Sequence, residues 1–485
     1  MNAGAPAGRA LRNVAGAVFT GLLVWAPLNF GSTRAGGPEL LTAGCAAGTV
    51  LWAAARGCDG RPAQIPAVAA CAAALFVLAV LPWSLGLYAP TSVLPFTEMH
   101  FARIATRWPQ SIVWRDPTNA AALAIALAAA VLPLIDLAHE RRWLFAFCGA
   151  LTATAVVVSV IALAQNYTNA PGIYWRAEGR LPGNFCGPFF HHTSAGAYFN
   201  TAWPLAVALT WLAWERVSVG THSPALGIGL GLATIVLLAG HTSHVSRFPQ
   251  VAALLVASLL WRGLTVRRAW RRPLLVAGLA ALAVFAGLVA ATGRAGDITA
   301  RWRLVFAANP AALPRASSTP AEWPALMRGD LFVPSPLGPG LLGIRREGWL
   351  TALRSIAARP VTGHGPANWI GAASHHSADP FVRTFYQFLQ FAHQDTLQSA
   401  VEWGLPAAIC WWLLLVGGAI AGLRASPQFP PARRVLGLAA GCGLLAVLLQ
   451  AQIDFPLQIP AVAFNAVVLA ALGWASARGP AYLTP

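Results

Sequence analysis

The chain has 485 residues, of which 57% are hydrophobic and only 10% are charged, and its formal net charge is +17 at pH 7. An ordinary soluble domain carries about 25% charged residues, so this composition excludes a soluble globular protein and indicates a polytopic membrane protein. The basic residues, all of them arginine, are scattered between apolar stretches. Membrane topology and anionic ligands explain that distribution better than nucleic acid does.

Apolar stretches long enough to cross a bilayer as helices, about 17–25 residues, recur along the chain. We predict twelve spans, at 11–30, 38–56, 65–89, 119–138, 143–165, 192–214, 223–240, 248–264, 273–292, 403–423, 434–453 and 458–476. No small-residue cleavage site convincingly follows the first stretch, so we interpret it as a retained span rather than a signal peptide. The predicted fold class is therefore an all-α polytopic membrane protein with about 12 transmembrane helices.

Arginines gather in the short connections on one side of these spans, for example at 262–272 and 424–434. The short connections on the other side, at 31–37, 241–247 and 454–457, carry one arginine or none. The positive-inside rule then predicts that both ends of the chain lie in the cytoplasm.

One outer segment is much longer than the others. From Thr292 to Glu402 it holds ten of the 33 basic residues and four of the eleven histidines. Its apolar spacing predicts two amphipathic helices, at Gly343–Arg359 and Phe381–Val401. The chain is thus predicted to divide into transmembrane helices 1–9 (1–292), a large periplasmic loop (293–402), and transmembrane helices 10–12 with a cytoplasmic tail (403–485).

Arg247 begins the eighth predicted span, directly after a short outer turn. An arginine at the rim of a span can snorkel or cap a neighbour, and it can also hold phosphate through paired hydrogen bonds. His241 and His244, three residues apart in the same turn, lack a carboxylate partner, and we predict no metal site.

Two further segments have both a structural and a functional interpretation. The Gly- and Pro-rich run that ends at His191 and His192, with Arg180 just upstream, is either an interfacial loop or a wall of an outer cavity. Adjacent Arg345 and Arg346 open the first loop helix and form either a headgroup-facing surface or an anion site.

His393 lies in the second predicted amphipathic helix. A helix histidine is often a packed structural residue, but a pKa near neutrality also allows it to act as general base on a sugar hydroxyl. Asp395, two residues further on, points away from His393 on a helix and is not expected to orient its ring.

Several short motifs occur in a fixed order. They are Gly183-x-Phe185-x-x-Pro188-x-x-His191, Ser246-Arg247, Arg345-x-x-x-Trp349, Pro360-x-x-Gly363-x-Gly365, and His393-x-x-x-Leu397 with Glu402-x-Gly404. Over about residues 180–460 this order and spacing resembles the O-antigen ligase-related family of bacterial membrane glycan transferases. That family includes ligases, Wzy-type polymerases and protein O-oligosaccharyltransferases. Gln394 and Thr396 stand where the family usually has Asn and Tyr.

The resemblance implies a GT-C-like helical fold in the bacterial inner membrane. It also implies metal-independent and cofactor-independent transfer of a glycan from undecaprenyl diphosphate to a periplasmic acceptor, which is a lipid A core, a glycan or a protein. By the same resemblance Arg247 and Arg345 hold the donor diphosphate and His393 activates the acceptor hydroxyl. We predict as further substrate-binding residues Arg346, Arg180, His192 and His364.

Alternative functions remain open at this point. A Wzy-type polymerase would use the same site, and the sequence does not separate it from a ligase. A transporter or flippase of an anionic substrate would place charged residues deep within spans. Asp136 and Asp454 lie instead near predicted span ends, and no repeat symmetry between halves is visible. A structural partner in an envelope-assembly complex is a third possibility.

Overall fold

The computed structural model describes residues 4–60, 62–92, 116–176, 186–220, 223–241, 246–264, 287, 343–377, 391–425 and 428–477. Within these ranges the chain is all-helical, apart from an isolated antiparallel bridge between Cys186 and Phe189. The predicted all-α class is confirmed for this part of the chain.

Each predicted span that falls within the described ranges coincides with a helix. The helices are α1 (Gly4–Leu28), α2 (Gly37–Asp59), α3 (Ala67–Ser84), α5 (Pro117–Ala138), α6 (Arg141–Tyr167), α7 (His192–Ser218), α8 (Pro224–His241), α9 (Arg247–Leu264), α17 (Leu405–Leu423), α18 (Pro431–Gln450) and α19 (Pro460–Ala475). The predicted span 273–292 and residues 293–342 of the predicted loop lie outside the described residues.

Seven of the described helices are long and apolar enough to cross a membrane, namely α1 (from Pro6), α3, α5, α6, α8, α17 and α18. The helices α2, α7 and α9 have comparable lengths but do not reach the same hydropathy, and α19 has 16 residues. The chain is therefore a multi-pass membrane protein. The predicted count of about twelve exceeds the number that length and apolarity support in the described part.

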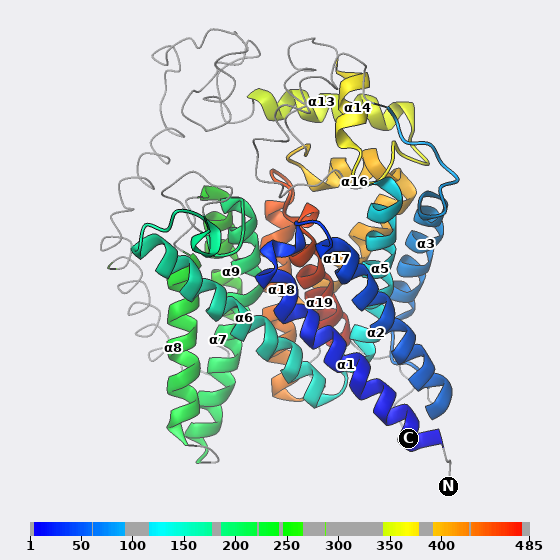
Figure 1. The fold of residues 1–485 in the computed structure, drawn as a ribbon. Helices are drawn as coiled ribbons and strands as arrows, with labels where there is room; N and C mark the ends of the chain where they lie inside the picture. The colour runs from blue at the N-terminus through cyan, green and yellow to red at the C-terminus, as the bar shows by residue number, and fades with distance from the viewer. Residues whose placement is uncertain are drawn as a thin grey trace.

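Helix α19 lies at the centre of the bundle, where it packs against α5, α7, α17 and α18 (Figure 1). All but one of its residues are buried, which fits a sequence that is apolar on every face. A Cβ atom at Gly473 would collide with the carbonyl oxygen of Gly418 in α17. Glycine is therefore required for the close approach of these two helices.

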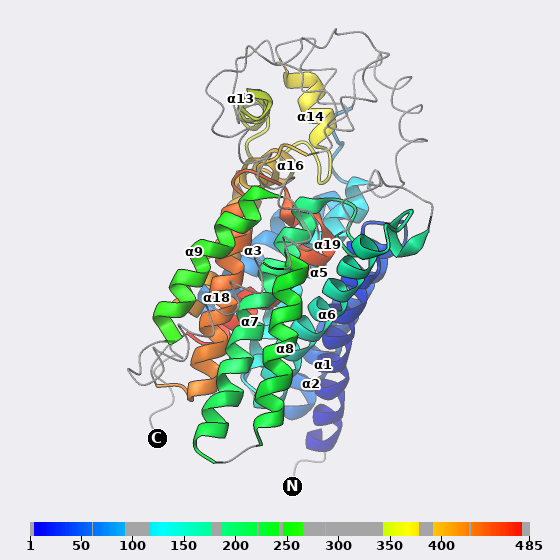
Figure 2. The ribbon, with the colours of Figure 1, turned by 90° about the vertical axis from the view of Figure 1, so that its left-hand side faces the viewer.

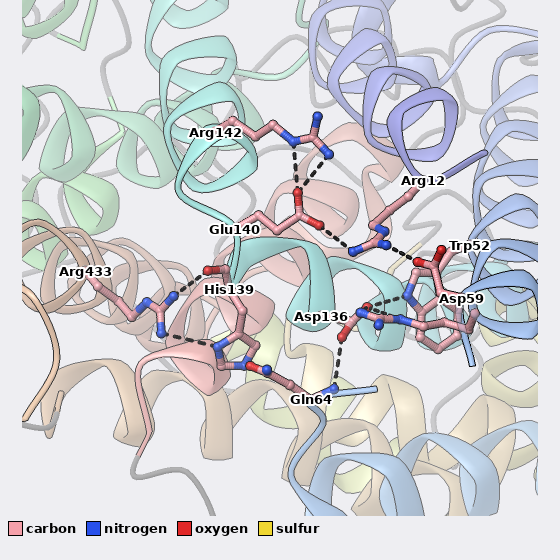
Figure 3. A network of polar contacts seen from close by, with 10 residues as sticks. Arg12, Trp52, Asp59, Gln64, Asp136, His139, Glu140, Arg142 and Arg433 are labelled. Atoms are coloured by element: carbon pink, nitrogen blue, oxygen red, sulfur yellow. Dashed lines mark hydrogen bonds and ion pairs between the residues drawn. The ribbon is translucent and has the colours of Figure 1, made fainter. Parts of the chain in front are cut away.

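A polar network fastens the helices at the end of the bundle where α1 begins (Figure 3). Arg12 of α1 forms ion pairs with Asp59 at the end of α2 and with Glu140 before α6. Asp136 of α5 accepts hydrogen bonds from the Trp52 Nε1 at 2.7 Å, from the Arg56 Nε at 2.8 Å and from a backbone N–H. The network links α1, α2 and α5 with the residue that precedes α6.

The same network reaches α18 through His139. The Arg433 guanidinium donates to the His139 carbonyl at 2.5 Å. Burial, followed by the charge of Arg433, lowers the pKa of His139 to about 4. This histidine is therefore neutral at physiological pH, where it packs beside the arginine without repelling it.

Replacing Asp136 with alanine is expected to destabilise the folded protein by about 3–5 kcal/mol, because the Arg56 guanidinium would stay half-buried without its counter-charge. Thermal unfolding in detergent measures the loss. Glu140→Gln serves as the control, because Glu140 is more exposed than Asp136 and its loss should lower the melting temperature less. Equal melting temperatures for wild type and Asp136→Ala would show that the network does not stabilise the bundle.

The opposite end of the bundle is covered by three shorter helices, α13 (Gly343–Ala358), α14 (Trp369–His376) and α16 (Asp395–Trp403) (Figure 2). They share a small apolar core of their own around Trp369 and Val401. The Trp83 Nε1 at the end of α3 donates to the Thr362 carbonyl at 2.9 Å, which fixes this cap to the bundle. Helix α13 confirms the predicted helix at Gly343–Arg359.

Candidate active site

His393 lies just before α16 and not within a helix, so the prediction for this residue was wrong. The side chain of Gln394 accepts a hydrogen bond from the Leu397 N–H and caps the helix, which begins at Asp395. His393 itself has a φ of +52°, in the left-handed region. The ring therefore projects from a tight turn, while 381–390 of the predicted helix lies outside the described residues.

Asp454, in the connection between α18 and α19, is the acidic partner of His393. The Nδ1 atom of His393 lies 3.3 Å from the Oδ1 atom of Asp454, the separation of an ion pair rather than of a short hydrogen bond. Burial acts to raise the pKa of Asp454. The contact with His393 and the charges of His393, His191 and Arg345 outweigh burial and hold that pKa below its ordinary value.

The ionised Asp454 has a chemical consequence for the ring beside it. A carboxylate facing Nδ1 favours a proton on that nitrogen, which leaves the Nε2 atom of His393 as the proton acceptor. The same carboxylate stabilises the imidazolium that forms when Nε2 takes up a proton. The pair thus has the arrangement that a general base needs.

Asp395 performs a different task, since its carboxylate accepts hydrogen bonds from the Leu457 N–H at 2.8 Å and from the Gln458 Nε2 at 2.9 Å. Its own N–H donates to the Ala451 carbonyl at 2.8 Å. Burial raises the pKa of Asp395 well above its ordinary value, although these hydrogen bonds act in the opposite direction. Asp395 therefore joins the start of α16 to the connection that carries Asp454.

Phe455 gathers the aromatic and histidine rings of the site. Its ring centroid lies 4.8 Å from that of His393, 5.4 Å from that of His191 and 4.4 Å from that of Phe391. The His191 ring stacks in turn on His192, with centroids 4.6 Å apart. The start of α7 and the turn before α16 thus meet on one phenylalanine.

Arg345, in the first turn of α13, is brought to this pair from a third segment, since its charge contributes to the lowered pKa of Asp454. Its charge thus acts on the carboxylate that faces His393, and binding of the donor diphosphate by Arg345 stays a prediction. The side chain of Arg346 and all of Arg180 lie outside what the structure describes.

Arg247 is the first residue of α9, and a contact with α7 holds this end of α9. The Asn200 Nδ2 donates to the Pro249 carbonyl at 3.0 Å, while the Asn200 Oδ1 lies 3.0 Å from the His241 Nε2. Because Asn200 lies near the start of α7, Arg247 and the stacked His191 and His192 share one end of the bundle. Phosphate binding by Arg247 and substrate binding by His192 stay predictions.

His364 is buried in the turn between α13 and α14, with 1% of its surface exposed. Its Nδ1 atom lies 2.7 Å from the Thr91 hydroxyl and its Nε2 atom 2.8 Å from the Ser355 carbonyl oxygen. Burial lowers the pKa of His364 below its ordinary value, and the hydrogen bond to Ser355 opposes this. Both contacts are made within the chain, and a role in substrate binding stays a prediction.

Residues 232–412 match the family model described as O-Antigen ligase. The match runs from α8 to α17, so it includes Arg247, Arg345 and His393 and ends before Asp454. A comparison with curated proteins finds no match. The matched segment, together with a bundle of apolar helices, supports an O-antigen ligase-related family for this chain.

Proposed function

We propose that this protein is a glycosyltransferase that moves a glycan from undecaprenyl diphosphate to an acceptor hydroxyl at the periplasmic face of the bacterial inner membrane. The match of residues 232–412 to the O-Antigen ligase family model supports an enzyme of this kind. The observation that carries the proposal is the His393–Asp454 pair with Arg345 nearby, because it combines a proton acceptor with fixed positive charge.

In the proposed reaction, Nε2 of His393 takes the proton of the acceptor hydroxyl as its oxygen bonds to the anomeric carbon of the glycan. The bond between that carbon and the diphosphate oxygen breaks, and the diphosphate leaves with the bonding electrons, still attached to its lipid. Arg345 and Arg247 would stabilise the charge that develops on the diphosphate. Asp454 would stabilise the imidazolium until its proton is lost to solvent.

The distribution of arginines between the two ends of the bundle supports the proposed periplasmic location. Arg12, Arg56 and Arg433 lie in the network at one end, and the His393 site lies at the other. The end richer in short arginine-bearing connections faces the cytoplasm under the positive-inside rule. This supports a site that is open to the periplasm and to lipids of the outer leaflet.

Transfer by the purified protein is expected to need no divalent cation, since guanidinium groups would carry the charge that a metal supplies elsewhere. The assay combines the full chain, a glycan on undecaprenyl diphosphate and an acceptor lipid A core, with and without EDTA. Equal product in both samples is expected. Loss of product with EDTA and its return with Mg²⁺ would contradict metal independence, and absence of product without EDTA would contradict the proposed reaction.

The products of that assay also separate a ligase from the Wzy-type alternative. A ligase transfers the donor glycan once to the lipid A core. A polymerase extends one lipid-linked glycan with another and yields a ladder even when the lipid A core is omitted. A ladder of this kind would replace the ligase with the polymerase as the function of the same site.

A further inference from the structure

Glu402 and Gln398 form a hydrogen-bonded line inside the cap that ends at the backbone beside His393. The Gln398 Nε2 donates to the Glu402 Oε1 at 2.8 Å, and the Gln398 Oε1 accepts from the Ala392 N–H at 2.9 Å. The two side chains are four residues apart on α16, the spacing at which helix side chains meet. Both are buried, at 1% exposure for Gln398 and 2% for Glu402.

The second oxygen of the Glu402 carboxylate, Oε2, is held by the turn between α13 and α14. The Ala367 N–H donates to the Glu402 Oε2 at 2.8 Å, and the Gly365 N–H donates to the Glu402 carbonyl at 3.0 Å. Glu402 is therefore fixed against the turn between α13 and α14. Since its Oε1 atom can only accept, it also fixes which end of the Gln398 amide faces Ala392.

His393, which follows the backbone amide held by this line, has an energetically unfavourable backbone conformation. A side chain other than glycine in the left-handed region costs of order 1–3 kcal/mol, and the surrounding contacts must maintain it. His393 is flanked by two fixed amides, because the Ala392 N–H is held by Gln398 and the Asp395 N–H is held by the Ala451 carbonyl. The first of these anchors depends on Glu402.

We infer that Glu402 is a positioning residue for His393 and that it acts through Gln398, without itself touching the substrate. The inference rests on the proposed function of His393 as the general base. Loss of the line frees the Ala392 amide, lets the turn relax, and moves the imidazole away from Asp454 and from the acceptor hydroxyl. A displacement of about 1 Å at a catalytic group lowers a rate by up to about 10²-fold.

The test exchanges the two side chains. In Glu402→Gln the new NH₂ group is a donor, and it must face either the Gln398 NH₂ group or the Ala367 N–H, which are donors too. In Gln398→Glu two carboxylates face each other. In the double variant the new carboxylate at 398 accepts from the Ala392 N–H and from the new amide at 402, whose oxygen accepts from the Ala367 N–H. The double variant thus restores every hydrogen bond of the line, with the amide and the carboxylate exchanged between positions 398 and 402.

Each single variant is expected to lower kcat by about 10–10²-fold with KM for the donor unchanged, and the double variant to return kcat to within about threefold of wild type. Hydrogen exchange at the Ala392 amide should accelerate in the single variants and slow again in the double variant. Ser399→Ala is the matched control, because Ser399 lies on the same helix, is equally buried and accepts from the Trp412 Nε1 at 3.0 Å. It should lower the melting temperature and leave kcat unchanged.

The inference is overturned if the single variants keep wild-type kcat, or if the double variant remains as slow as they are. A fall in kcat for Ser399→Ala as large as theirs also overturns it, since instability alone would then explain the loss. Failure of the proposed function looks different, because the wild-type chain then transfers no glycan or His393→Ala transfers it normally. In that case the exchange rate at Ala392 still reports whether the line holds the turn.

Discussion

Replacing His393 with alanine is expected to lower the rate of glycan transfer by about 10²–10⁴-fold, the contribution typical of a general base. The ring is well placed to accept a proton, since its Nδ1 atom faces Asp454 and its other nitrogen is left to receive a proton. Initial rates with a saturating donor measure the change. The melting temperature of the variant, compared with wild type, shows whether the fold is preserved.

Two further measurements, of donor binding and of rescue by imidazole, make this prediction specific. The donor should still bind to His393→Ala with nearly unchanged affinity, because the proposed phosphate contacts come from arginines. Imidazole supplied in the buffer should restore part of the rate if the variant lacks only a base. Wild-type transfer by His393→Ala would remove this residue from the mechanism, and a loss of donor binding alone would assign it to the donor site.

The helices of the bundle could be predicted from the sequence because apolar length is a local property. The predicted span 119–138 and the helix Pro117–Ala138 differ only at the first residues. The number of membrane-spanning helices was harder to predict, because α7 and α9 carry polar side chains such as Asn200 and Gln250 that lower their hydropathy. These helices are held by contacts with neighbours, such as the bond from Asn200 to Pro249, which hydropathy does not record.

The turn at His393 could not be predicted from periodicity. Apolar spacing between 381 and 401 favoured one continuous helix, whereas the start of α16 is set by the Gln394 cap and by the bond from Ala392 to Gln398. Both are side-chain contacts with the backbone, and such contacts compete with helix formation at single positions. A hydrophobic pattern averaged over many residues does not reveal them.

Asp454 was recognised in the sequence only as an acidic residue near a span end, and its place in the site was missed. It reaches His393 because Asp395 ties the start of α16 to Leu457 and Gln458 in the same connection. The available signal was a lone carboxylate in a short outer connection next to Phe455. Without the packing of α18 and α19 beneath the cap, that signal does not identify the histidine that it serves.

Replacing Asp454 with asparagine is expected to lower kcat by about 10²–10⁴-fold, because an amide can hold the Nδ1 atom of His393 as an acceptor and so leave the wrong tautomer for catalysis. Donor affinity should change little, since the side chain faces the histidine rather than an arginine-bound phosphate. Initial rates over a range of donor concentrations separate the two effects. A wild-type kcat in this variant would show that the carboxylate has no part in the reaction.

The same substitution should alter how stability depends on pH, in a direction fixed by the lowered pKa of Asp454. A carboxyl group whose folded-state pKa lies below its unfolded value of about 3.9 stabilises the protein above that value, and the stabilisation is lost as the pH falls through the folded-state pKa. Wild type should therefore lose melting temperature more steeply below about pH 4 than Asp454→Asn, which has no proton to gain there. Melting curves recorded at half-unit pH intervals provide the measurement, and parallel profiles down to pH 2 would show that the charge of His393 does not stabilise this carboxylate.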